Sequence, residues 1–200
     1  MSKRLVIISN RIPTDSAPSG GLVFALHETL QRKGGIWVGT RQANNASLAS
    51  SLTPVPTQEN YERLLFDLTP DDHKTFYLGF SNSVLWPVCH RRGDLVDLNR
   101  VYEEGYIHVN ARLARQLYQT LRDDDLVWVH DYHFFPLAAE LRKLGFRGKI
   151  GFFLHIPFPA LGDLGALPAQ INLAEWLSEY NLVGLQTRAD VARCLEMYRA

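Results

Sequence analysis

The chain has 200 residues, with 21 basic and 21 acidic side chains, 46% hydrophobic residues and 11% aromatic residues. This length allows one full domain or two small ones, and the apolar content suffices for a sizeable core, which excludes a disordered tail or a low-complexity linker. A formal net charge of zero argues against a strongly basic protein that binds nucleic acid, although local sites for small anions stay open.

Cysteine usage and the first residues bear on where the protein works. Cys89 and Cys194 are too few for a disulfide framework and their spacing is not that of a metal site, so we expect free thiols in a reducing cytosol. Only four apolar residues, 5–8, follow the basic start, which is too few for a signal peptide. No apolar run approaches the about 18 residues of a membrane span, so we expect a soluble cytoplasmic protein with no membrane partner.

Short β-rich runs alternate with helical patterns along the chain. The predicted strands cover 5–8, 36–38, 64–66, 126–129, 150–154 and 182–185. The predicted helices cover 22–33, a segment that begins at Thr69 and Pro70, 99–121, 135–144, 173–178 and 190–198. The stretch 41–57, which is rich in Asn, Ser, Ala and Pro, predicts a mobile surface loop. The alternation predicts a Rossmann-like, doubly wound α/β fold, whose parallel sheet binds ligands at the carboxyl ends of its strands.

Residues after the first strand suggest an anion site. Asn10 and Arg11 follow the strand, and Gly20 and Gly21 open the next helix. Free amides at a helix start favour phosphate, and an arginine can hold an anion with two hydrogen bonds. An ordinary glycine loop with a surface arginine is the alternative. The pattern is neither a P-loop nor Gly-x-Gly-x-x-Gly, so nucleotide binding does not follow from it.

An aromatic cluster covers residues 76–87. Tyr77 and Trp86 combine a flat apolar face with a polar tip, which suits packing on a sugar ring, although most of the cluster is expected to pack in the core. Cys89 has no base beside it in the sequence, so we expect a buried apolar residue there and not a nucleophile.

Polar side chains also follow two later strands. Asp131 and His155 come after the runs 126–129 and 150–154, so parallel strands would bring them to one edge. A carboxylate accepts hydrogen bonds from sugar hydroxyls, and a histidine can donate one or move a proton. One alternative is a structural histidine with Asp131 as a helix cap. Another is a zinc or iron site built with His130 and His133.

Five motifs resemble those of the trehalose-6-phosphate synthase family, whose members are retaining GT-B glycosyltransferases with two Rossmann-like domains facing across a cleft. The motifs cover residues 8–11, 19–22, 82–87, 128–133 and 151–159. The resemblance implies that residues 1–200 form the N-terminal acceptor-side domain, incomplete at its C-terminal end. It also implies that the C-terminal domain that binds the nucleotide sugar is absent from this chain.

The same resemblance implies a reaction. Glucose would move from UDP-glucose to glucose 6-phosphate with retention, giving trehalose 6-phosphate, without a metal or other cofactor. In the front-face route proposed for this family, the departing diphosphate oxygen accepts the proton of the acceptor hydroxyl, so the protein mainly positions the substrates and stabilises charge. We expect this chain alone to bind glucose 6-phosphate weakly and to transfer no glucose. A homo-oligomer is left open.

Carried over by residue, the resemblance divides the site into two sides and implies catalytic roles for Asp131 and His155. It assigns the acceptor side to Arg11, Tyr77, Trp86, Asp131 and Tyr132. It assigns the donor side to Gly20, Gly21 and His155.

One departure from the family bears on the acceptor. Thr40 stands after Gly39, where the family usually has a tryptophan. A sister transferase with another acceptor, such as glycerol 3-phosphate, is therefore one alternative. A non-catalytic regulatory subunit that senses a sugar phosphate is a second alternative, and a metal-dependent hydrolase is a third.

Overall fold

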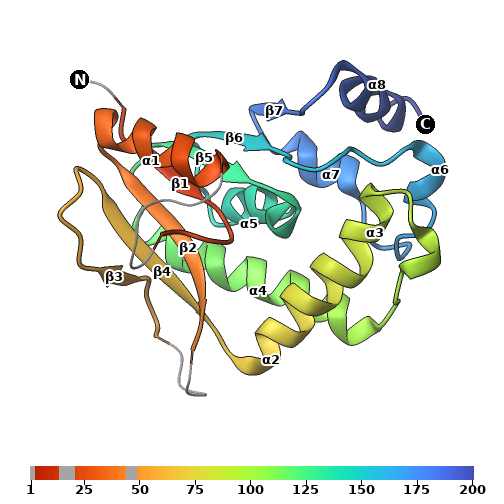
Figure 1. Cartoon of the computed structure of the whole chain (residues 1–200), viewed down its shortest axis with the longest axis horizontal. Helices are drawn as coiled ribbons and strands as arrows, with labels where there is room; N and C mark the ends of the chain where they lie inside the picture. Colours follow the sequence, from red (N-terminus) through yellow and green to blue (C-terminus); the bar gives the residue numbers. More distant parts are fainter. Residues whose placement is uncertain (1–2, 14–20, 44–48) are drawn as a thin grey trace.

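The computed structural model describes residues 3–13, 21–43 and 49–200. Within these residues seven strands form one sheet in the order β3-β4-β2-β1-β5-β6-β7 (Figure 1). The strands are β1 (Leu5–Ile8), β2 (Ile36–Gln42), β3 (Thr53–Val55), β4 (Glu62–Leu68), β5 (Leu126–His130), β6 (Lys149–Phe153) and β7 (Leu182–Gly184). All neighbours pair in parallel except β3, which pairs antiparallel with β4. This is the predicted doubly wound sheet, and its strand order reverses between β1 and β5.

Helices cover both faces of this sheet (Figure 1). They are α1 (Gly21–Lys33), α2 (Pro70–Asp72), η1 (His73–Leu85), α3 (Trp86–Cys89), η2 (Gly93–Leu95), α4 (Arg100–Tyr118), η3 (Tyr132–Phe134), α5 (Leu137–Lys143), α6 (Leu161–Leu164), α7 (Leu173–Ser178) and α8 (Arg188–Met197). On one face, α1 buries Leu26 and Leu30 against Ile7 and Trp37. On the other face, η1, α4 and α5 build the larger core. Among the described residues, no helix is both long and apolar enough to cross a membrane.

The prediction of a loop over 41–57 is wrong in part. Its first two residues extend β2, and Thr53–Val55 forms β3 at the sheet edge; residues 44–48 lie outside the described residues. Pro54 obscured this strand because proline cannot donate to a ladder, yet at an edge that loss is tolerated. β3 therefore depends on its partner β4 and not on a strand pattern of its own.

The helix predicted to begin at Thr69 does begin there. Thr69 and Asp72 form a capping box, in which each side chain accepts a 2.9 Å hydrogen bond from the other residue's backbone N–H. The helix then continues as η1, a 13-residue π-helical stretch of a kind that is rare and often found near functional sites. The absence of a side chain at Gly79 and Gly105 lets η1 approach α4 closely. A Cβ at Gly79 would collide with Tyr102, and a Cβ at Gly105 would collide with Thr75. This packing fixes the position of η1 beside the ends of β1 and β5.

Candidate functional site

A cavity of about 250 Å³ lies at the carboxyl ends of β1 and β5, where the strand order of the sheet reverses. Three segments and η1 contribute side chains to it. The lining residues are Ser9, Asn10 and Arg11 after β1, Leu22 and Val23 in the first turn of α1, Tyr77 on η1, and His130, Asp131, Tyr132 and His133 at the end of β5. Ligands of doubly wound sheets bind at this point, so the cavity is the candidate site.

Arg11 supplies the positive charge of this cavity. Its side chain is exposed, and its Nη2 donates a hydrogen bond of 3.3 Å to the Tyr77 hydroxyl. The loop that carries it is fixed by Ser9, whose hydroxyl donates to the Arg11 carbonyl (2.8 Å) and accepts from Trp37 Nε1 (2.8 Å). The guanidinium group is thus held at the cavity, where it can meet an anion.

A second hollow of about 160 Å³ adjoins the first and shares Asn10, Arg11 and Tyr77 with it. Thr40 lines this hollow, and its hydroxyl lies within hydrogen-bond distance of both the Asn10 carbonyl (2.8 Å) and Asn10 Oδ1 (3.0 Å). The hydroxyl of Thr40 is therefore engaged with Asn10 in the loop after β1, and His73 faces the same hollow from η1. The open space around Arg11 is consequently wider than the first cavity alone.

Asp131 is held in a strained backbone conformation. Its φ of 75° and ψ of 164° lie in a region that almost only glycine adopts. The neighbouring strand enforces it, because the Asp131 N–H donates to the Phe153 carbonyl (2.8 Å) and Asp131 Oδ1 accepts from the His155 N–H (3.3 Å). Burial raises the pKa of the Asp131 carboxyl, while the bonds from the His155 and Tyr132 amides oppose that rise. Such strain is typical of a residue whose position serves function.

Two histidines meet beside this aspartate. His130 is the last residue of β5, His155 follows β6, and His130 Nδ1 lies 2.9 Å from His155 Nε2. Burial lowers the pKa of His130 to about 3, with the neighbouring His155 as a further cause, and burial also lowers the pKa of His155. Both imidazoles are therefore neutral at pH 7.

A third histidine forms the aromatic wall of the cavity. His133 stacks on Tyr77 with ring centroids 5.6 Å apart and an interplanar angle of 10°, and its other neighbour Tyr132 lies at 4.2 Å. Burial lowers the pKa of His133 to about 3, and the charge of Arg11 contributes. The Tyr132 hydroxyl donates to Asn82 Oδ1 (3.0 Å), and burial raises the pKa of that phenol. The wall is thus neutral and apolar in character, with Arg11 as its cationic rim.

The structure brings together most of the residues predicted for the acceptor side. Arg11, Tyr77, Asp131 and Tyr132 line one cavity, whereas Trp86 does not line it. Trp86 stacks instead on His90, with ring centroids 3.9 Å apart, and is 37% exposed.

The predicted donor side is described only in part. His155 adjoins the cavity through His130 and Asp131, and Gly21 is the first residue of α1. Gly20 lies outside the described residues. Leu22 and Val23, which sequence reasoning missed as lining residues, follow that glycine pair directly, so their place at the helix start was the available signal.

Two further points from the sequence concern chemistry other than sugar transfer: the alternative of a zinc or iron site, and the expectation that Cys89 is a buried apolar residue. Within the described part of the chain, no group of three or more His, Cys, Asp or Glu side chains could hold a metal ion. Two of the ring nitrogens that such a site could use, His130 Nδ1 and His155 Nε2, are hydrogen-bonded to each other. Cys89 is buried, and burial raises the pKa of its thiol, which agrees with an apolar residue and not a nucleophile.

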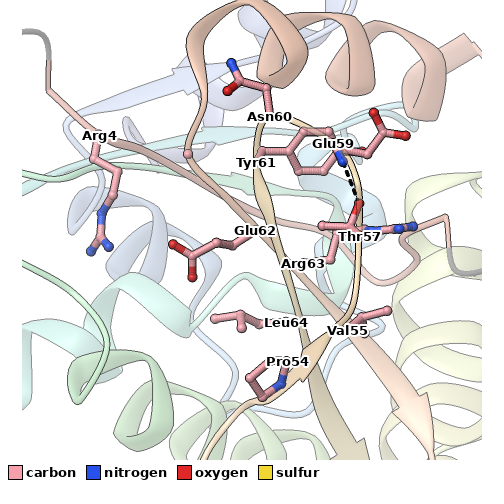
Figure 2. Close-up of a pocket in the computed structure, with 11 residues that line it drawn as sticks. Arg4, Pro54, Val55, Thr57, Glu59, Asn60, Tyr61, Glu62, Arg63 and Leu64 are labelled. Carbon is pink, nitrogen blue, oxygen red and sulfur yellow. Dashed lines mark hydrogen bonds between the residues drawn. The ribbon is translucent and has the colours of Figure 1, made fainter.

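A separate cavity of about 420 Å³ lies at the amino ends of β1, β2 and β4 (Figure 2). Arg4 lines it, but this guanidinium is bonded to both oxygens of Asp125 (2.9 and 2.6 Å) and to the Thr120 carbonyl (3.0 Å). Arg63, from β4, donates to the Pro13 carbonyl. Both arginines thus serve the fold, and this end of a parallel sheet is not where its ligands bind.

Comparison with known proteins gives a family match over nearly the whole chain. The family model described as glycosyltransferase family 20 matches residues 4–199. The trehalose-6-phosphate synthase of Sinorhizobium fredii is 42% identical over 200 residues, which is 96% of this chain and 43% of that relative. The chain therefore spans about two fifths of the length of the curated relatives that it matches.

Solved structures agree with this match. An E. coli structure described as bound with UDP-2-fluoro glucose superposes with a TM-score of 0.90 at 42% identity, covering 98% of this chain and 43% of that one. An α,α-trehalose-phosphate synthase (UDP-forming) from Burkholderia xenovorans, in complex with glucose-6-phosphate, superposes with a TM-score of 0.87 at 40% identity. That match covers 96% of this chain and 42% of that one.

Proposed function

Since this chain belongs to glycosyltransferase family 20, we propose that it is the N-terminal, acceptor-side part of an enzyme that moves glucose from UDP-glucose to glucose 6-phosphate with retention. The product would be trehalose 6-phosphate, made in the cytoplasm. Relatives named trehalose-6-phosphate synthase are more than twice as long as the matched segment, and we assign UDP-glucose binding mainly to their unmatched part. The observation that carries the proposal is the convergence of Arg11, Tyr77 and Asp131 on one cavity at the reversal of the strand order.

The acceptor side follows from the chemistry of these groups. The planar guanidinium of Arg11 suits the phosphate of glucose 6-phosphate, and the Tyr77 hydroxyl beside it (3.3 Å) can bind the same phosphate. The Asp131 carboxylate has acceptor positions beyond its two long backbone bonds and can accept from sugar hydroxyls. We assign Tyr132 to the wall against which the sugar ring packs.

The donor side involves fewer residues of this chain. We propose that His155 contacts the transferred glucose and that the start of α1 at Gly20 and Gly21 faces the donor diphosphate. We also keep Trp86 as an acceptor-side residue that joins the site when the second domain is present. Neutral groups and helix amides can stabilise developing charge without exchanging protons, which agrees with a reaction that depends on positioning.

Titration of the isotope-labelled chain with glucose 6-phosphate tests the acceptor site. We expect weak binding with amide shift changes at Arg11, Tyr77 and Asp131, and much weaker binding of glucose, because the phosphate supplies the charged contact. In Arg11→Ala the same changes should need a much higher concentration of glucose 6-phosphate. The matched control Arg92→Ala, which removes an exposed arginine paired with Asp94, should leave them. Shifts confined to the cavity of Figure 2 would contradict the assignment.

Two further measurements narrow the function. Competition with glycerol 3-phosphate asks which acceptor the hollow beside Thr40 prefers, and we expect glucose 6-phosphate to bind more tightly. Incubation of the purified chain with UDP-glucose and glucose 6-phosphate should yield no trehalose 6-phosphate, because transition-state charge needs donor-side groups that the chain does not supply. Formation of trehalose 6-phosphate by this chain would refute the proposal that glucose transfer also needs donor-side groups from the rest of the enzyme.

A further inference from the structure

His130 has no role in the proposed acceptor or donor contacts, yet it is 1% exposed at the end of the central strand β5. Its ring lies nearly in the plane of the His155 ring, with an interplanar angle of 24° and ring centroids 5.2 Å apart. With nitrogens only 2.9 Å apart, that centroid separation requires the two rings to face each other edge to edge. The contact is therefore an in-plane N–H···N hydrogen bond and not a face-to-face stack.

The rest of His155 is fixed from other directions. Its backbone N–H donates to Asp131 Oδ1 (3.3 Å), and its carbonyl accepts from Gln186 Nε2 (2.7 Å). The main remaining freedom of this residue is rotation of the imidazole. The Phe153 ring packs beside the imidazole (4.6 Å between centroids), and His130 restricts the rotation further through its hydrogen bond. His130 is itself held by burial and by its contact with the Trp128 ring (4.5 Å between centroids). His130 thus decides which edge of the His155 ring faces the site.

The hydrogen bond also constrains where the protons sit. A neutral imidazole has one N–H and one lone pair, and a bond between two ring nitrogens needs one of each. If His155 donated from Nε2, His130 would carry its own proton on Nε2, which is buried and has no partner among the described residues. Buried N–H groups without a partner are rarer than under-satisfied acceptors. The favoured arrangement has His130 Nδ1–H as the donor and a bare lone pair at His130 Nε2.

We propose that His130 is a positioning residue that holds His155 in the Nδ1–H tautomer, so that His155 offers one fixed N–H donor to a sugar hydroxyl or leaving-group oxygen. Only the identity of that oxygen rests on the proposed glycosyltransferase function. The inference changes the expected chemistry of His155. Its Nε2 is engaged with His130, so His155 acts as a neutral hydrogen-bond donor and not as a group that takes up a proton.

The tautomer can be read directly in the chain as it stands. Imidazole ¹⁵N spectra of the histidine-labelled protein at pH 7 distinguish a protonated ring nitrogen from a bare one, and assignment by His155→Asn identifies the signals. We expect His155 to be protonated at Nδ1 and bare at Nε2, and His130 to be protonated at Nδ1. A His155 protonated at Nε2 would overturn the proposal.

Variants of His130 separate positioning from mere packing. His130→Asn places an amide N–H where Nδ1 was and should keep His155 in the Nδ1–H tautomer. His130→Leu fills the space without a donor, so the His155 ring should exchange between tautomers and its two ¹⁵N shifts should converge. Trp128→Phe is the matched control, because it keeps an aromatic ring against His130 and leaves the hydrogen bond to His155, so the His155 shifts should be unchanged.

The outcomes are distinct from those of the substrate experiments. An unchanged His155 tautomer in His130→Leu would refute the proposal even if glucose 6-phosphate binds as expected. Loss of glucose 6-phosphate binding in the wild type would instead refute the acceptor assignment and leave the tautomer result standing. If His130→Leu fails to fold, the wild-type spectrum and His130→Asn still decide, because both measure the same protonation pattern.

Discussion

Two cavities lie at opposite ends of the parallel strands, and they differ in what lines them. The amino-end cavity (Figure 2) is the larger, about 420 Å³ against about 250 Å³, and its Arg4 is neutralised by Asp125. The carboxyl-end cavity holds a strained Asp131 and the buried neutral histidines His130 and His133. Backbone strain and shifted pKa values are typical of functional positions. The residues that line the smaller cavity therefore identify it as the candidate site, although the other cavity has the larger volume.

The difference follows from what each end does for the fold. Arg4 precedes β1 and Asp125 precedes β5, so their ion pair ties the two central strands together at the amino end. At the carboxyl end β5 is followed by Asp131, whose carboxylate accepts two backbone hydrogen bonds of 3.3 Å, from Tyr132 and His155. One end is consequently built for stability, and the other retains polar groups that a ligand can satisfy.

The largest expected effect is a loss of stability in acid that comes from the carboxyl end. Both His130 and His133 have folded-state pKa values of about 3, below the about 6.5 of an unfolded histidine. The unfolded chain therefore binds more protons below pH 6.5, and stability falls as the pH drops. The two histidines together should cost about 4 kcal/mol between pH 7 and pH 5.

His133→Phe tests this pH dependence, because it keeps a ring against Tyr77 and removes the titrating group. Urea unfolding at pH 7 and pH 5 should show the variant losing about 2 kcal/mol less than the wild type. Equal losses in the two proteins would contradict a buried neutral His133.

The second effect belongs to the amino end. Arg4→Met should lower the free energy of unfolding by about 3 kcal/mol, because the Asp125 carboxylate is fully buried and would lose its counter-charge. Binding of glucose 6-phosphate at a temperature where the variant is folded should be unchanged. Weakened binding with intact folding would show that the two ends are not as separate as described.

The third expected effect is a loss of binding without a loss of stability, the opposite of what Arg4→Met should do. Arg11→Ala should leave the free energy of unfolding within about 0.5 kcal/mol, since the side chain is exposed. It should weaken glucose 6-phosphate binding about 30-fold, which corresponds to about 2 kcal/mol for a charged hydrogen-bond pair. Calorimetric titration measures the affinity, and urea unfolding of the same preparation measures the stability. A variant that loses stability but not affinity would contradict the assignment of Arg11 to binding.

The smallest effect concerns the strain at Asp131. Asp131→Ala and Asp131→Gly both remove the carboxylate, but only glycine adopts a φ of 75° and ψ of 164° without strain. After the extra chain entropy of glycine is subtracted, the glycine variant should be about 1 kcal/mol more stable than the alanine variant. Urea unfolding compares the two directly, and a less stable glycine variant would mean that the backbone is unstrained there.

Much of the architecture could be predicted from the sequence because its signals are local. Continuous apolar runs such as Leu5–Ile8 mark strands that are buried on both faces, and the Thr69 to Asp72 capping box lies within four residues. Arg11, Asp131 and His155 could be proposed for the site because each follows a predicted strand, and parallel strands end at one edge. The strand over Thr53–Val55 could not, because it depends on pairing with β4.

The sequence by itself determined the order of strands and helices and the edge of the sheet that carries the polar residues, since both follow from patterns a few residues long. Only the tertiary structure decided that Trp86 does not line the cavity, that Arg4 meets Asp125 across 121 positions, and that His130 is hydrogen-bonded to His155. The last two contacts depend on the register between β1, β5 and β6. Register is fixed locally where apolar and polar residues alternate, but these strands are continuous apolar runs, so their register depends on packing against the rest of the sheet.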